Sequence, residues 1–187
     1  MKSIRLLNLI VLIPMFCLFA CSGKIDETGR NNLVGKWVGH VADGTFVGND
    51  TLFLASDSSF KECKGVVYSS SDSGFDFSVE VNIGIEGHWS LKEDSLMVIY
   101  NPETLRISTD KKTFRVSATE SNVNADLLSG VRDSMYDDLD SYLSGMLQSE
   151  YAPLLGKELV MGKIGHLDSK NLLLSSGKTK VLLSRCR

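Results

Sequence analysis

Residues 75–91 alternate apolar and polar side chains, and this is the strongest structural signal in the chain. The odd positions hold Phe75, Phe77, Val79, Val81, Ile83, Ile85, Gly87, Trp89 and Leu91. The even positions hold Asp76, Ser78, Glu80, Asn82, Gly84, Glu86, His88 and Ser90. A period of two is typical of a β-strand that buries one face. A straight strand of this length would exceed about 50 Å at about 3.3 Å per residue, so we expect it to curve near Gly84 and Gly87.

Shorter segments with β character surround this strand and are separated by polar turns. They cover residues 33–42, 51–55, 60–68, 95–100, 105–109, 113–118, 158–164, 171–174 and 179–183. The segments 56–59, 92–94 and 110–112 have the composition of turns. Long, curved strands with one apolar face are typical of closed barrels. We therefore predict a mainly β fold, an antiparallel up-and-down β-barrel of about eight to nine strands.

One segment, residues 125–148, changes from the strand period to a helical period. Its apolar stripe is Leu128, Val131, Met135, Leu139, Tyr142 and Met146, and Leu127, Leu143 and Leu147 widen this stripe. These spacings of three and four residues predict a single long amphipathic helix before the last strands. Asp133, Asp137 and Asp140 mark the side that we expect to face solvent.

The N-terminus has the features of an export signal. Lys2 and Arg5 precede an apolar run over 6–19, and Ala20-Cys21 follows it. The run is shorter than the roughly 18 residues of a membrane-spanning helix. The segment resembles a bacterial lipoprotein signal, and this resemblance implies cleavage before Cys21 and lipidation of its sulfur. An ordinary signal peptide with a chance cysteine is the alternative.

This signal divides the chain into three parts. Residues 1–20 are the predicted signal peptide, and the polar segment 21–32 is a predicted flexible tether. Residues 33–187 form the predicted barrel domain, with its helix at about 125–148. We therefore expect a lipid-anchored protein of the cell envelope, at the outer membrane, on a side that the sequence does not decide.

Charge and motifs argue against several classes of function. The formal net charge is −3, and loss of the signal leaves 18 basic residues (20 less 2) against 23 acidic, or −5. Without a basic stripe, nucleic acid is not an expected partner. The chain shows no nucleophile motif and no phosphate-binding loop, and His40, His88 and His166 lack metal-ligand spacing. We predict a protein that is not an enzyme and has no catalytic residue, metal or cofactor.

Two cysteines of the predicted domain remain for oxidative pairing. Cys17 leaves with the signal and Cys21 is the lipidation site, so Cys63 and Cys186 are left in an oxidising compartment. A disulfide between them would close a long loop and contribute about 4–5 kcal/mol in the chain-entropy model. The alternative is two free thiols, because a sequence does not show whether they meet.

Two short motifs resemble lipocalin-like lipoproteins of Bacteroidota. Gly35-Lys36-Trp37 matches the G-x-W mark of the first lipocalin strand. The segments 87–91 and 94–98 resemble a "G-x-W … D-x-L-x-L" hairpin of these lipoproteins. The resemblance implies structural roles for Gly35, Trp37 and Trp89. It also implies that a late arginine, here Arg185, packs on the first-strand tryptophan at the base of the barrel.

The interior of such a barrel admits two functions. Small barrels either fill with side chains or hold one apolar ligand. The candidate ligand-binding residues are Phe75, Phe77, Val79, Val81, Tyr100 and Phe114, although core packing explains the same residues without a ligand. The first hypothesis is non-catalytic binding of a small apolar or amphipathic molecule in or at the mouth of the barrel. The alternative is a protein-interaction or inhibitor scaffold of the cell envelope with a filled barrel.

Overall fold

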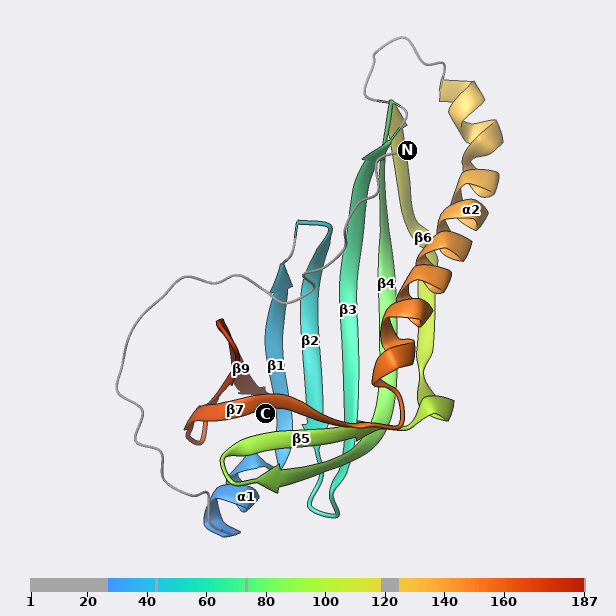
Figure 1. The fold of residues 1–187 in the computed structure, drawn as a ribbon. Coiled ribbons are helices and arrows are strands. Elements are labelled where there is room, and N and C mark those ends of the chain that lie inside the picture. Colours follow the sequence, from blue (N-terminus) through green and yellow to red (C-terminus); the bar gives the residue numbers. More distant parts are fainter. Residues whose placement is uncertain (1–26, 43, 73, 119–124, 187) are drawn as a thin grey trace.

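The computed structural model describes residues 27–42, 44–72, 74–118 and 125–186, with the side chains of the long helix described from Arg132. Figure 1 shows the arrangement of its elements. In chain order they are α1 (Glu27–Leu33), β1 (Gly35–Ala42), β2 (Phe46–Leu54), β3 (Ser59–Asp72), β4 (Phe75–Lys92), β5 (Ser95–Tyr100), η1 (Pro102–Thr104), β6 (Arg106–Ala118), α2 (Ala125–Tyr151), η2 (Ala152–Leu154), β7 (Glu158–Leu167), β8 (Asn171–Ser176) and β9 (Thr179–Cys186).

Eight of the strands close into an antiparallel barrel. Their order is β3-β2-β1-β9-β8-β7-β5-β4, and β4 pairs with β3 to complete the circle. Strand β6 pairs with β4 outside the circle, and α2 follows β6 before the chain returns as β7. The predicted antiparallel barrel with one helix before its last strands is therefore confirmed.

Strand β4 has the predicted alternation, and it curves at its lower end, where its pairing passes from β6 to β5 (Figure 1). Val79, Val81, Ile83 and Ile85 are buried, and the intervening side chains are polar or exposed. One edge of β4 pairs with β3 over 75–88, whereas the other edge pairs with β6 over 75–84 and with β5 over 87–92. The strand therefore changes partners near Gly87, where a Cβ atom would lie 2.0 Å from the Ile99 carbonyl oxygen.

This change of partners lets β4 be longer than the barrel. Its first part extends beyond the barrel together with β6, the adjoining part of β3 and α2 (Figure 1). We call this extension the arm. A strand that leaves the barrel for an added layer needs less bending than one that stays within it, which explains how the long strand fits.

Strand β6 corrects a second expectation. The segments 105–109 and 113–118 were expected to be two strands separated by a turn at 110–112, but one strand covers both. Glu80 pairs with Asp110 whereas Ser78 pairs with Arg115, so β6 bulges between these positions. The Thr113 hydroxyl donates to the Asp110 carbonyl and accepts from the Glu80 amide. The turn-forming residues thus produce a bulge, which needs the same local hydrogen bonds as a turn.

Helix α2 packs along β6 and confirms the predicted helix, with three further residues at its C-terminus. Among its side chains from Arg132 onward, Leu143, Leu147 and Tyr151 are buried, whereas Tyr142 from the predicted stripe is 57% exposed. Asp140 was expected to face solvent, but its carboxylate accepts a hydrogen bond from Thr109 of β6 at 2.6 Å. Burial of Leu143 and Leu147 agrees with the predicted apolar face, which they widen, whereas Tyr142 lies outside the buried part.

The base of the barrel is held by Trp37, and the contact implied by the lipocalin resemblance is confirmed. The indole of Trp37 is fully buried and donates to the Leu33 carbonyl at 2.7 Å. The Arg185 guanidinium lies 4.4 Å from the centroid of the indole ring and donates to the Val34 carbonyl. Gly35 has φ +145°, and a Cβ atom there would lie 2.8 Å from a guanidinium nitrogen. Glycine is therefore needed beside the arginine.

Helix α1 closes the same end and corrects the predicted tether. Residues 27–32 were expected to be flexible, but they belong to α1, which ends in the fully buried Leu33. The Arg30 guanidinium lies 5.4 Å from the Trp89 ring and donates to the Ser58 hydroxyl. Trp89 is itself buried and donates to the Ala55 carbonyl at 2.9 Å. The ordered domain thus begins before residue 33.

The expected signal peptide and the lipidation site Cys21 lie outside the described residues. Of the helices that the structure does describe, none combines the length and the apolar character of a membrane span.

The predicted disulfide between Cys63 and Cys186 is wrong, because both cysteines are free. Cys63 lies on β3 and Cys186 at the end of β9, and β2 and β1 separate these strands. Three strand spacings amount to about 14 Å, whereas disulfide-bonded Cα atoms lie about 4.4–6.8 Å apart. The closed sheet holds the thiols apart.

We therefore expect reductant to leave the stability of the protein unchanged. Urea unfolding with and without dithiothreitol should give the same free energy of unfolding. A disulfide across this loop would add about 4–5 kcal/mol to the free energy of unfolding of the oxidised protein. A loss of that size on reduction would show that the disulfide forms.

Candidate functional site

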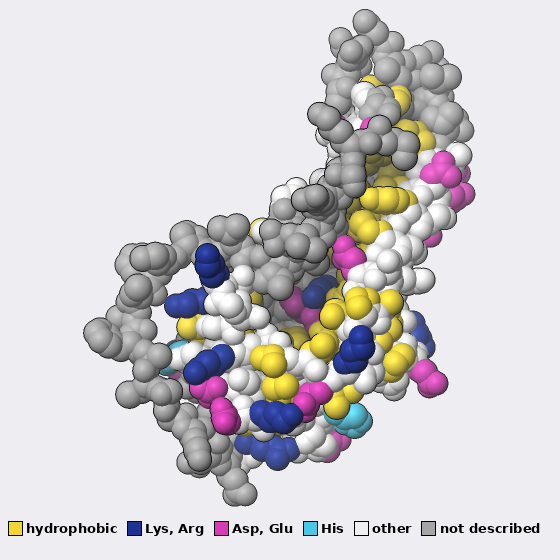
Figure 2. Space-filling view, viewed as in Figure 1, with side chains coloured by type: hydrophobic (Ala, Val, Ile, Leu, Met, Phe, Trp, Pro, Cys, Tyr) yellow, Lys and Arg dark blue, Asp and Glu magenta, His cyan; other side chains and the backbone are white. Residues whose placement is uncertain are grey.

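The interior of the barrel contains a cavity of about 410 Å³. Ligand sites in proteins usually measure about 300–1,000 Å³, so this volume is of ligand size. Figure 2 shows the surface hollowed beside the lower part of α2, with acidic and basic side chains inside the hollow. The wall of the cavity is mainly apolar and includes Phe46, Leu52, Val66, Ile83, Val98, Leu147, Leu159, Met161, Leu174, Val181 and Leu183.

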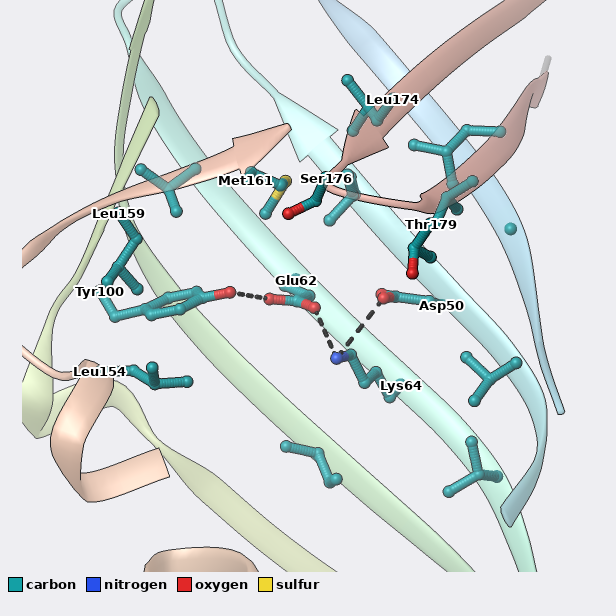
Figure 3. Close-up of a pocket in the computed structure, with 18 of the residues that line it drawn as sticks. Asp50, Glu62, Lys64, Tyr100, Leu154, Leu159, Met161, Leu174, Ser176 and Thr179 are labelled. Atoms are coloured by element: carbon teal, nitrogen blue, oxygen red, sulfur yellow. Dashed lines mark hydrogen bonds and ion pairs between the residues drawn. The ribbon is translucent and has the colours of Figure 1, made fainter. Parts of the chain in front are cut away.

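Four polar side chains cross the floor of the cavity in a row (Figure 3). Asp50 comes from β2, Glu62 and Lys64 from β3, and Tyr100 from the end of β5. Strand periodicity explains why they point inward, since Glu62 and Lys64 share a face with the buried Phe60 and Val66. We call these four residues the charged row.

The charged row is joined by short contacts. The Lys64 ammonium lies 2.9 Å from Glu62 Oε1 and 3.6 Å from Asp50 Oδ2. The Tyr100 hydroxyl donates to Glu62 Oε2 at 2.7 Å. Both carboxylate oxygens of Glu62 therefore have a partner, and Glu62 is only 4% exposed. The row places two carboxylates around one cation.

Glu62 and Lys64 are held in their charged forms by each other. Burial alone would raise the pKa of Glu62, but the Lys64 charge and the hydrogen bond from Tyr100 outweigh it and lower the pKa. Burial alone would lower the pKa of Lys64, but the charges of Glu62 and Asp50 raise it well above its ordinary value. Removal of Lys64 would leave Glu62 as an uncompensated buried charge, whereas removal of Glu62 would leave Lys64 with Asp50 alone, at 3.6 Å.

Asp50 is the least satisfied member of the row. Among the described residues, no donor lies within hydrogen-bonding distance of its Oδ1. Its Oδ2 lies 3.6 Å from Lys64, longer than a normal hydrogen bond. Burial, followed by the charge of Glu62, raises the pKa of Asp50 to about 7. Asp50 therefore changes charge near neutral pH.

Tyr151 at the end of α2 covers the row from the helix side. The Lys64 ammonium lies 5.9 Å from the centroid of its ring, and the rings of Tyr100 and Tyr151 are 6.3 Å apart. Burial is the main reason why the pKa of Tyr151 is raised to about 12, and burial followed by the Glu62 charge also raises the pKa of Tyr100. Both phenols are therefore neutral hydrogen-bonding groups at physiological pH.

Of the six ligand-binding residues predicted from the sequence, Tyr100 alone lines this cavity. Phe75 and Phe77 lie on the part of β4 that pairs with β6 in the arm. Val79 and Val81 are fully packed in the core, and Phe114 packs edge-on against Tyr136 of α2. The alternation of apolar and polar residues along β4 continues into the arm. This alternation therefore did not distinguish the residues of the cavity from those of the packed core.

Sequence reasoning missed Asp50, Glu62 and Lys64, although a signal for two of them is present. The segment 60–68 alternates, and its even positions are Phe60, Glu62, Lys64, Val66 and Tyr68. Two opposite charges at neighbouring inward positions are unusual in a strand, because charged side chains are rarely buried unless paired. The alternation of residues 60–68 is enough to place Glu62 and Lys64 on the inward face. Asp50 can be assigned to the same cluster only from the pairing of β2 with β3.

The histidines take no part in a cluster of metal ligands. His40 lines the cavity, His88 is exposed on β4, and His166 contacts Asp168 at 2.9 Å. The described part of the chain contains no group of three or more His, Cys, Asp or Glu side chains placed to hold a metal ion.

Comparison with known proteins leaves the site to be interpreted from its geometry. No protein-family model matches the chain, and no curated protein matches it either.

Proposed function

We propose that this protein is a non-catalytic, lipid-anchored protein of the cell envelope that binds one small amphipathic molecule inside its barrel. The observation that carries the proposal is a ligand-sized cavity with an apolar wall and a charged row on its floor. Apolar burial supplies affinity in such sites, and a few fixed polar groups orient the ligand. Anchoring to the membrane through Cys21 rests on the sequence of residues 1–21.

The charged row supports a binding role more than a structural one. Replacing a buried ion pair by packed apolar side chains is often neutral or stabilising. A barrel selected for rigidity alone has no need of Asp50, Glu62 and Lys64 in its interior. A site that must orient a polar group needs such side chains.

The alternative, a scaffold with a filled barrel, has less support. The cavity of about 410 Å³ does not agree with a filled interior. One surface that such a scaffold could present is the acidic face of α2, but its Asp133 and Asp137 form ion pairs with Lys111 at 3.2 and 3.8 Å. A partner that docked on this acidic face would therefore have to displace Lys111, a cation that the protein itself supplies.

A matched pair of variants on β3 tests the proposal. Val66 lines the cavity and is 5% exposed, whereas the adjacent Val67 points outward and is 39% exposed. Val66→Phe should fill part of the cavity and weaken saturable binding of the small fluorescent probe 1-naphthol at least tenfold, or by about 1.4 kcal/mol. Val67→Phe should leave the dissociation constant within about twofold, because it adds the same ring outside the barrel.

Circular dichroism should show that both variants keep the folded sheet. Native mass spectrometry of the purified protein adds an independent measurement, in which we expect a small molecule retained by the wild type and lost from Val66→Phe. The proposal fails if the wild type shows no saturable site, or if both variants bind the probe equally well.

A further inference from the structure

At pH 8, above the pKa of about 7 of Asp50, the charged row carries an unbalanced charge. With both carboxylates ionised, Asp50 and Glu62 contribute two negative charges and Lys64 contributes one positive charge, so the row has a net charge of −1. Glu62 already accepts from Lys64 and Tyr100. The excess negative charge therefore belongs to Asp50, whose Oδ1 has no donor among the described residues.

Asp50 is also the more exposed of the two carboxylates, although its Oδ1 atom is itself buried. Its side chain is 23% exposed, whereas that of Glu62 is 5% exposed. Because Asp50 lines the cavity, that exposed surface faces the same space as the apolar wall. Ser176 and Thr179 line the cavity as well and add two neutral hydroxyl groups.

We propose that the cavity selects amphipathic primary amines, with the ligand ammonium on the Asp50 carboxylate and the apolar tail along the barrel wall. This inference rests on the proposed function, since it names the chemical class of the ligand for the same cavity. A second cation beside Asp50 gives two carboxylates and two ammonium groups in alternation, and charge-assisted hydrogen bonds of this kind are stronger than neutral ones.

The same arrangement disfavours an anionic ligand. A fatty carboxylate would raise the net charge of the row to −2 in apolar surroundings, where like charges repel strongly. Lys64 offers little compensation, because its ammonium already contacts Glu62 and Asp50. A neutral alcohol can donate one hydrogen bond to Asp50 but brings no charge. The expected order of affinity is therefore amine, then alcohol, then carboxylate.

The proposal includes a dependence on pH. Asp50 is faced by Glu62 and Lys64 from β3 and by Tyr151 from α2, and the cavity is also lined by His40. Since the pKa of Asp50 is about 7, its carboxyl is mostly neutral at pH 5.5 and mostly ionised at pH 8. An alkylamine stays charged over this range, because amines of the lysine type have a pKa near 10.4. Amine affinity should therefore rise roughly thirtyfold from pH 5.5 to pH 8.

The test uses three ligands that each contain eight carbon atoms and differ in the head group: octylamine, 1-octanol and octanoate. At about 30 Å³ per non-hydrogen atom, octylamine and octanol have volumes of roughly 270 Å³ and octanoate of roughly 300 Å³, all below the 410 Å³ of the cavity. Isothermal titration calorimetry with the full chain at pH 8 measures the three dissociation constants. Val66→Phe, which fills part of the cavity, is the control for ligand binding elsewhere on the protein. We expect octylamine to bind at least tenfold more tightly than octanol, and octanoate to bind most weakly.

Asp50→Asn should remove the preference without removing the site. The substitution keeps the shape of the side chain. It should raise the dissociation constant of octylamine at least tenfold, whereas the dissociation constant of octanol should change by no more than about threefold. The raised pKa of Asp50 means that its ionised form is disfavoured in the folded protein, so the neutral variant should remain folded at pH 8. Glu80→Gln removes an exposed carboxylate from the outer face of β4 and is the control for net charge.

The outcomes separate this inference from the proposed function. Octanoate binding as tightly as octylamine, or an unchanged octylamine constant in Asp50→Asn, overturns the amine assignment while the cavity remains a binding site. Absence of saturable heat with all three ligands overturns both. The variant His40→Asn should keep the rise of affinity with pH, and loss of that rise would assign it to His40 instead of Asp50.

Discussion

Replacing Lys64 with methionine is expected to destabilise the folded protein by about 3–5 kcal/mol at neutral pH, because it leaves Glu62 charged and buried without its cation. Methionine has a similar length, so the loss reflects charge more than volume. Glu62 keeps only its hydrogen bond from Tyr100, which does not neutralise a carboxylate. Urea unfolding followed by circular dichroism measures the change in the free energy of unfolding.

The pH dependence of this variant gives the sign of the effect. Without Lys64, burial raises the pKa of Glu62 in the folded state above its unfolded value, so the missing stability returns as pH falls and the carboxyl takes up a proton. The deficit should therefore be smaller at pH 5 than at pH 7.5. The double variant Glu62→Gln/Lys64→Met should recover most of the loss, because the buried Glu62 charge is gone and the remaining carboxyl, Asp50, has a raised pKa and can take up a proton. A single variant as stable as the wild type would show that the two charges are not buried together.

Trp37→Ala is expected to cost about 3–5 kcal/mol, the usual range for removing a fully buried aromatic side chain. The indole connects three elements at the base of the barrel. It donates to the carbonyl of Leu33 in α1, belongs to β1, and lies under the guanidinium of Arg185 from β9. The substitution therefore leaves a cavity and also removes the surface on which the arginine rests.

Phe53→Ala is the matched control for this prediction. Phe53 is an aromatic residue of β2 that is 37% exposed on the outer face of the barrel. Its loss should change the free energy of unfolding by about 1 kcal/mol or less. If Trp37→Ala costs no more than Phe53→Ala in urea unfolding, Trp37 does not hold the base of the barrel.

Local periodicity explains which parts of the fold could be predicted. The side chains of a strand alternate whatever its partners are, so the alternation over 75–91 identified β4 and its buried face. The spacing of three and four residues identified α2 in the same way. The contact between Arg185 and Trp37 came from the lipocalin resemblance, since residues so far apart in sequence carry no local signal of contact.

The remaining features depend on contacts between distant segments. Val81 and Phe114 have the same apolar character as cavity residues, and only the pairing of β4 with β6 places them in the packed core. The thiols of Cys63 and Cys186 are separated by two intervening strands, which no property of either residue reveals. Asp50 joins Lys64 because β2 and β3 pair in one register. A shift of that register by one residue would turn Asp50 outward.

The cavity and the charged row make a single physical arrangement. Apolar side chains from both sides of the barrel leave space between them, and the row places its one incompletely satisfied carboxylate at the edge of that space. Binding of a ligand would offset the cost of keeping Asp50 away from water, which gives the interior a role that packing alone does not explain.

A crystal structure of the full-length protein grown with octylamine tests the central claim most directly. We predict ordered ligand density inside the barrel, with its tail against Val66 and Leu174 and its nitrogen within hydrogen-bonding distance of Asp50. A barrel whose opposing side chains meet across a closed interior, with no space for the ligand, would contradict it.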